Sequence, residues 1–78
     1  MNELILKEMN TQRIIYLYHP NGDTPFGEIA YLFSDKQAYV MKKADNDETG
    51  YFAQKATKKV EECVGKNHLP LKLTQAWY

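Results

Sequence analysis

The sequence predicts a small α+β domain over residues 1–78, with an antiparallel or mixed sheet of four to five strands and one helix packed on one face. Three observations predict this class. Short runs rich in β-branched and aromatic residues alternate with polar turns, one stretch has apolar residues at helical spacing, and a further apolar run follows that stretch. The expected element order is therefore β(β)ββαβ.

Four segments before the helix have the character of strands. Residues 3–9 contain a short apolar run and are expected to form the first strand. Residues 13–18, 28–33 and 38–42 are rich in β-branched and aromatic side chains, which favours strands. Residues 19–27 hold two prolines and two glycines, and this composition predicts a loop.

The helix is expected to begin shortly after Asp47. Its apolar residues recur at spacings of one, three and four, as one face of a helix requires: Phe52, Ala53, Ala56, Val60, Cys63 and Val64. Asp47 or Thr49 is expected to cap its first N–H groups, and Gly65 to end it in a left-handed conformation. Residues 69–77 then predict a last strand, with Pro70 at its beginning or on an edge.

One helix covers only one face of such a sheet, so the other face is left for water or a partner. We expect Ile15 and Leu17 to face the helix, because tyrosine suits an exposed sheet face whose hydroxyls stay wet. Tyr16 and Tyr18 would then form an aromatic row on the open face, continued by Tyr39. The opposite phase, which would bury both tyrosines, stays open at this point.

Charge argues against a general nucleic-acid binder. Ten basic and ten acidic residues give no net charge, whereas phosphate binding usually requires a basic excess. The distribution is uneven, however: residues 1–35 carry two basic and five acidic side chains, and residues 36–78 carry eight and five. A nucleic-acid interface combining lysines with tyrosine stacking is therefore the alternative hypothesis, with Lys42, Lys43, Lys55, Lys58 and Lys59 as its residues.

The sequence carries no recognisable catalytic, metal or cofactor motif. Cys63 falls on the apolar helix face, and neither His19 nor His68 stands at metal-site spacing from it. The acidic run 45–50 resembles the start of a calcium loop, but Ala56 stands where the bidentate glutamate is needed. We expect no enzyme activity and no cofactor.

No apolar run approaches the length of a membrane span, and the N-terminus lacks the basic region of a signal peptide. A single cysteine favours a reducing compartment. We therefore expect a cytoplasmic protein that does not bind membranes.

These observations together predict a non-catalytic binding module that contacts another protein through the open aromatic face, with Tyr16, Tyr18 and Tyr39 as its contact residues. Pairing of two such faces would give a homodimer. Small proteins of this kind often act as accessory subunits or inhibitors of a larger enzyme, and some are phage-encoded inhibitors of host enzymes.

Overall fold

The computed structural model describes residues 1–22 and 25–76. In chain order it contains four strands, one helix and a final strand: β1 (Asn2–Met9), β2 (Arg13–Pro20), β3 (Gly27–Leu32), β4 (Gln37–Lys42), α1 (Tyr51–Gly65) and β5 (Lys72–Gln75). The predicted fold class and element order are confirmed. The predicted last strand is shorter than expected, beginning after Pro70, and its predicted end at Trp77 lies outside the described residues.

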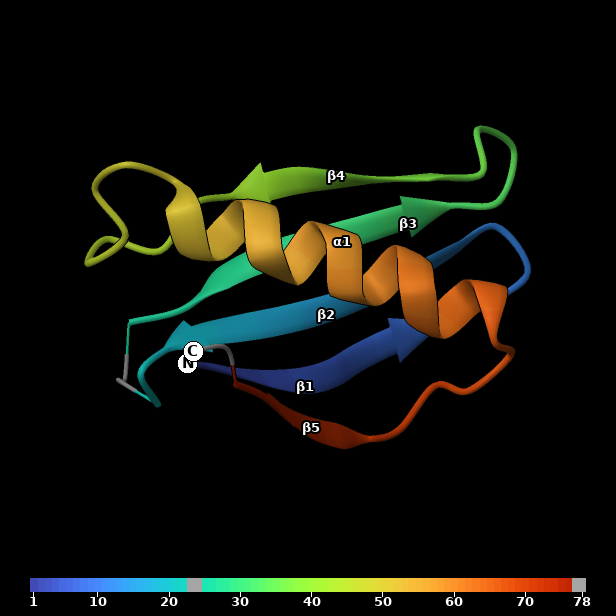
Figure 1. The fold of residues 1–78 in the computed structure, drawn as a ribbon. Helices are drawn as coiled ribbons and strands as arrows, with labels where there is room; N and C mark the ends of the chain where they lie inside the picture. Colours follow the sequence, from blue (N-terminus) through green and yellow to red (C-terminus); the bar gives the residue numbers. More distant parts are fainter. Residues whose placement is uncertain (23–24, 77–78) are drawn as a thin grey trace.

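The five strands form one antiparallel sheet in the order β4-β3-β2-β1-β5. The first four strands follow one another as hairpins. After β4 the chain crosses the sheet through α1 and returns as β5 beside β1, so β4 and β5 are the two edge strands (Figure 1). The helix covers one face and runs in the direction opposite to β4 (Figure 1).

Asp47 provides the start of the helix, as the sequence indicates. Its carboxylate accepts the N–H groups of Phe52 at 3.2 Å and Ala53 at 2.9 Å, which have no partner within the helix. The predicted helix end is wrong in detail. Gly65 is the last helical residue, and Asn67, at φ 53°, has the left-handed conformation instead. Asparagine tolerates this conformation better than most residues with a side chain.

The tyrosines of β2 lie beneath the helix, which corrects the preferred phase of this strand. Tyr16 is 1% exposed and Tyr18 is 0% exposed, whereas Ile15 and Leu17 are only partly buried on the opposite face. Tyr16 and Tyr18, hereafter the tyrosine layer, belong to the main core with Leu4, Ile14, Ile29 and Val60.

Side-chain volume explains why the tyrosines are buried. The helix turns small residues toward the sheet, with Ala53 and Ala56 at 2% and 0% exposure, so the facing strand must supply large side chains to fill the space. Gly27 supplies further room, because any Cβ there would overlap the ring of Tyr18. The small side chains of the helix therefore determine which face of β2 is buried.

Both buried hydroxyls have hydrogen-bond partners. Tyr16 Oη donates to the carbonyl of Pro70 at 2.6 Å. Tyr18 Oη donates to Asp47 Oδ2 at 3.0 Å and accepts the N–H of Ala44 at 2.9 Å. Burial raises the pKa of each tyrosine to about 12. A buried hydroxyl is costly only when it lacks a hydrogen-bond partner. The tyrosine layer can therefore belong to the core without this cost.

Candidate functional site

The structure does not bring the three predicted contact tyrosines together. Tyr16 and Tyr18 lie under α1, where no partner reaches them. Tyr39 is 38% exposed, as expected, but it pairs with Ala30, which in turn pairs with Ile15 on the face away from the helix. The predicted aromatic row is therefore wrong, and Tyr39 is its one member on the surface.

The open face of the sheet carries its own charged pairs. Lys7 pairs with Glu28, Arg13 pairs with Glu8, and Lys72 pairs with Glu3, each between different strands. The apolar residues between them, including Ile5 and Leu17, are partly buried. On this face the charged side chains pair with one another around apolar residues that are already partly buried. The open face is therefore a weaker candidate for binding a partner than the sequence indicates.

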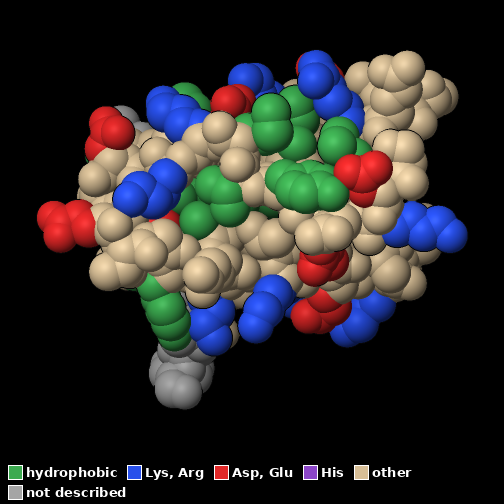
Figure 2. Space-filling view, turned by 90° about the horizontal axis from the view of Figure 1, so that it is seen from above, with side chains coloured by type: hydrophobic (Ala, Val, Ile, Leu, Met, Phe, Trp, Pro, Cys, Tyr) green, Lys and Arg blue, Asp and Glu red, His purple; other side chains and the backbone are tan. Residues whose placement is uncertain are grey.

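Strand β4 exposes three consecutive apolar side chains. Tyr39, Val40 and Met41 are 38%, 44% and 63% exposed and follow one another at one edge of the sheet. We call these three residues the β4 edge. Seen from this side, hydrophobic side chains gather in the middle of the surface with charged groups around them (Figure 2). Three consecutive exposed apolar residues on an edge strand are unusual, because edges are normally protected by charge or shortness.

The backbone of β4 is also available along this edge. The Ala38 N–H points away from β3 and donates to Glu61 Oε2 of α1 at 2.9 Å. Because neighbouring residues of an antiparallel strand alternate in direction, the Val40 N–H and C=O point outward in the same way. A second strand could therefore pair with β4, once the Glu61 carboxylate releases the Ala38 N–H.

A groove of about 380 Å³ runs between β4 and α1. Its walls are formed by two short segments of chain: Gln37, Ala38, Tyr39 and Val40 from β4, and Gln54, Thr57, Lys58 and Glu61 from α1. Thr57 is held in place by a bond from its hydroxyl to the Ala53 carbonyl at 2.8 Å. The helix thus provides a wall beside the exposed strand, against which side chains of an added strand could pack.

Tyr39 is held in position on this edge by Asp35. Its hydroxyl donates to Asp35 Oδ2 at 2.8 Å, and this hydrogen bond raises the pKa of Tyr39. Asp35 belongs to the β3–β4 turn, where its own N–H bonds the Leu32 carbonyl at 3.1 Å. The ring is therefore presented in a defined orientation, which lowers the entropy that a contact would cost.

The lysines of the nucleic-acid alternative are distributed over different surroundings. Lys42 lies 4.8 Å from the ring centre of Phe26, and Lys43 donates to the carbonyl of Glu48 at 2.9 Å. Lys59 forms an ion pair with Glu62 at 3.2 Å. Lys55 and Lys58 do lie together, in a hollow that they share with Tyr51 and Gln54. The five lysines therefore form no continuous basic surface.

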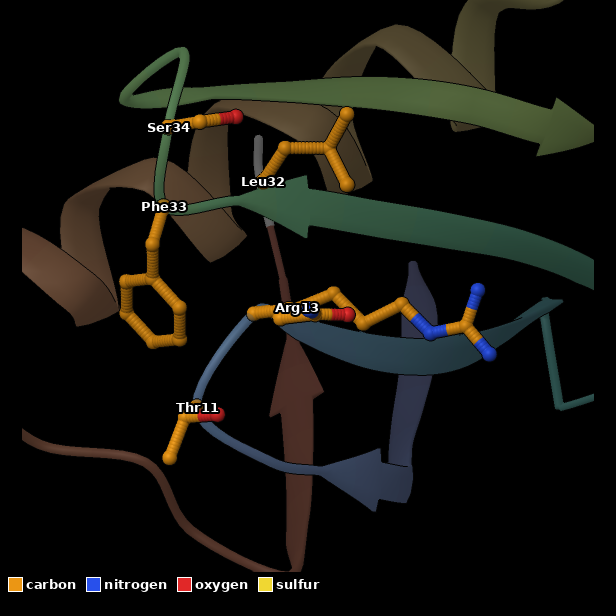
Figure 3. Close-up of a pocket in the computed structure, with 6 residues that line it drawn as sticks. Thr11, Arg13, Leu32, Phe33 and Ser34 are labelled. Atoms are coloured by element: carbon orange, nitrogen blue, oxygen red, sulfur yellow. The ribbon is translucent and has the colours of Figure 1, made fainter.

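Another hollow, of about 450 Å³, lies between the β1–β2 and β3–β4 turns. Figure 3 shows the ring of Phe33 beside Thr11, while the guanidinium group of Arg13 extends along β2 and away from them. Arg13 is paired with Glu8, and the Ser34 hydroxyl donates to Asp35 at 3.2 Å. The charged or hydroxyl groups of Arg13 and Ser34 are therefore bonded to carboxylates outside the lining of this hollow.

The described residues offer little for metal or thiol chemistry. Within residues 1–22 and 25–76 no three His, Cys, Asp or Glu side chains are grouped so that they could hold a metal ion. Cys63 is buried on the sheet side of α1, and burial raises the pKa of its thiol. In the same residues, no helix has the length and apolar character needed to cross a membrane.

Comparison of the chain with protein-family models, curated protein sequences and solved structures finds no significant match. The function is therefore argued from the geometry of the β4 edge alone.

Proposed function

We propose that this protein is a non-catalytic protein-binding module that uses the β4 edge as its contact surface. The observation that carries the proposal is the coincidence of exposed apolar side chains and outward-facing backbone groups on the same strand. Main-chain hydrogen bonds provide affinity when a strand is added to a sheet edge, and side chains on either side provide specificity.

The other edge of the sheet supports this choice by contrast. Strand β5 has four residues, compared with six in β4, and Pro70 and Lys72 stand at its start. Short length, proline and lysine are common means of protecting an edge from pairing. The β4 edge also ends in a lysine, Lys42, and contains a bulge, and Leu71 beside β5 is 76% exposed. The greater length of β4 and its run of consecutive exposed apolar residues are what distinguish the two edges.

We further propose that the protein acts in the cytoplasm as an inhibitor or accessory protein, including the case of a phage-encoded inhibitor of a host enzyme. Its size supports this role, because a chain of 78 residues offers about one contact surface of the usual dimensions. Occupying an edge or surface of a larger protein is a function that such a surface can perform without chemistry of its own.

Photo-crosslinking from two methionines tests the contact surface. Met41 on the β4 edge is 63% exposed, and Met9 at the end of β1 is 58% exposed, so the two positions form a matched pair. A diazirine analogue of methionine would be incorporated in cells into the Met9→Leu and Met41→Leu variants. Met1, 52% exposed, carries the probe in both variants and sets a common background. We expect more protein cross-links from the Met9→Leu variant, which retains the probe at position 41, than from Met41→Leu.

Equal cross-linking from both variants, or none from either, would contradict the proposal.

Binding of the wild-type protein to single-stranded DNA, measured at low and high salt, tests the alternative function. A steep loss of affinity with salt, removed by Lys55→Glu/Lys58→Glu, would favour nucleic-acid binding instead.

A further inference from the structure

We propose that the strand that pairs with the β4 edge belongs to a second copy of this chain, giving a symmetric dimer with one continuous sheet. This inference rests on the proposed function, because it names a second copy of this chain, in place of a strand of a larger protein, as the partner of the same surface. It is carried by the distribution of charge beside β4, where Glu61 of α1 lies near the start of the strand and Lys58 lies further along it.

The groove beside β4 has opposite charges at its two ends. Glu61 lies at the start of the strand, since it bonds the Ala38 N–H. Lys58 is one helical turn earlier in α1 and lines the same groove. Because α1 runs opposite to β4 (Figure 1), Lys58 lies further along the strand, near Val40.

The sequence flanking β4 is less one-sided, because Asp35 and Lys36 both precede the strand and Lys42 and Lys43 stand at its end. The opposite charges are therefore those of Glu61 and Lys58 in the groove. In an antiparallel pair of identical strands, the start of one strand lies beside the end of the other. Glu61 of each copy would therefore lie near Lys58 of the other copy. This contact occurs twice, once on each side of the two-fold axis, as an interface between identical surfaces requires.

One register satisfies both the charges and the backbone. If Tyr39 lies on the two-fold axis, Ala38 of each copy is opposite Val40 of the other. These are the residues whose N–H and C=O groups face outward, so each such pair exchanges two backbone hydrogen bonds. In the dimer the Ala38 N–H would donate to the Val40 carbonyl of the second copy instead of to the Glu61 carboxylate.

The same register gives the freed Glu61 carboxylate a new partner, because Glu61 would face Lys58 of the second copy. Asp35 keeps the hydrogen bond from the Tyr39 hydroxyl, and Lys43 keeps its bond to the Glu48 carbonyl. The register applies to residues 38–40, because a bulge follows Val40: Ile29 pairs with Val40, and the next residue, Glu28, pairs with Lys42. Beside these residues, the opposite charges of Glu61 and Lys58 favour the pairing.

Pairing would also cover the exposed apolar residues. The two Tyr39 rings would lie beside each other on the face away from the helices, and Val40 would pack between the two copies of α1. Met41 lies just beyond these paired residues, at the bulge in β4. A strand of uniform charge from another protein would suit only one half of this edge, whereas a second copy suits both halves.

Solution mass provides the first test, by sedimentation equilibrium over a range of concentrations. We expect the wild-type protein to approach twice its chain mass of 9.1 kDa. Val40→Pro removes the outward N–H and should give a monomer. Thr74→Pro on β5 is the matched control and should leave the dimer intact: the Leu71 carbonyl accepts from Leu6 of β1, so by alternation the Thr74 N–H points away from β1.

A charge exchange provides the second test. Glu61→Lys and Lys58→Glu should each weaken dimerisation by about tenfold, because each places two like-charged pairs in the interface. The double variant restores opposite charges across the axis and should recover most of the affinity. Glu62→Lys, one residue away on α1 but paired with Lys59 and Lys66, is the control and should leave the affinity unchanged.

Disulfide trapping tests the register. Residue 39 would lie opposite itself, at a Cα separation of about 4.5 Å that suits a disulfide. In a Cys63→Ala background, Tyr39→Cys should form a covalent dimer with oxidised glutathione faster than Lys72→Cys on β5.

A protein that stays monomeric at its highest soluble concentration would overturn the dimer. So would a dimer that Val40→Pro leaves intact, or equal trapping at positions 39 and 72. If the protein is monomeric while photo-crosslinking at Met41 captures a different protein, only this inference fails. If photo-crosslinking at Met41 captures neither a second copy of this chain nor a different protein, the proposed function fails as well.

Discussion

The tyrosine layer and the β4 edge use similar residues for different purposes. Tyr16 and Tyr18 are enclosed beneath α1, and their hydroxyls bond Pro70 and Asp47. Tyr39, two strands away, is exposed beside Val40 and Met41. The difference shows that residue type does not decide whether an aromatic side chain belongs to the core or to a contact surface. The space left by the opposing element decides it.

The comparison makes a general prediction that substitutions can test. Changes in the tyrosine layer should alter the free energy of unfolding, and changes at the β4 edge should alter association while leaving the unfolding of the monomer almost unchanged. Stability measurements should therefore be made at concentrations where the protein is monomeric, because association itself stabilises the folded state.

Alkaline pH should produce the largest effect, because it acts on the whole tyrosine layer. Tyr16 and Tyr18 have pKa values of about 12 in the folded protein and 10.0 when unperturbed. Their contribution is present below pH 10. As the pH rises from 10 to 12, the unfolded chain loses its tyrosine protons first, so the free energy of unfolding falls by about 5 kcal/mol for the pair.

Denaturant unfolding at a series of pH values, followed by tyrosinate absorbance, measures this loss. Tyr16→Phe and Tyr18→Phe should each remove part of the pH dependence, and Tyr39→Phe should remove little. A stability profile that stays flat from pH 10 to 12 would mean that the layer is open to solvent.

Gly27→Ala should have the next largest effect. A Cβ at this position would overlap both the Tyr18 ring and the Lys42 carbonyl, and the carbonyl belongs to backbone that cannot move easily. We expect the free energy of unfolding to fall by about 3 kcal/mol or more. Gly65→Ala is the matched control: nothing lies within 4 Å of its added Cβ, so stability should stay the same or rise slightly.

Asp47→Ala should cost about 2 kcal/mol, because it removes the helix cap and leaves the Tyr18 hydroxyl without its acceptor. Asp45, an exposed residue of the same loop, provides the comparison, and Asp45→Ala should change stability little. Thermal unfolding followed by circular dichroism distinguishes the two. Equal effects would show that Asp47 acts only through general charge.

Removing single hydroxyls should give the smallest effects. Tyr18→Phe should lower the free energy of unfolding by about 1 kcal/mol, because the Asp47 carboxylate and the Ala44 N–H lose a buried partner. Tyr39→Phe loses only an exposed bond to Asp35 and should be neutral in the monomer. A larger loss at Tyr39 than at Tyr18 would reverse the roles assigned to the two regions.

The strands and the helix could be predicted because their patterns are local. The phase of β2 could not, since both of its faces are apolar: Ile14, Tyr16 and Tyr18 on one, Ile15 and Leu17 on the other. A usable signal lay in the helix, where Ala53 and Ala56 require large side chains opposite them. The preference of tyrosine for wet surfaces predicts the opposite phase, and the space beneath the helix overrides it.

The site was only partly predictable for a different reason. Tyr39 is predicted from the sequence as a contact residue, whereas Val40, Met41 and Glu61 are not, because an edge strand is defined by strand order. That order depends on where the chain after α1 returns, and β5 joins β1 through long-range pairing that no local pattern encodes. The continuous apolar run at residues 39–41, unusual for a half-buried strand, was the available signal.

Amide hydrogen exchange at Val40 tests the role of the β4 edge most directly. In dilute protein this outward-facing amide should exchange quickly, and it should slow by about tenfold or more when the contact forms, at high concentration or with a captured protein bound. The Thr74 amide on β5 should keep its rate. An unchanged rate at Val40 in the bound state would show that the contact lies elsewhere on the protein.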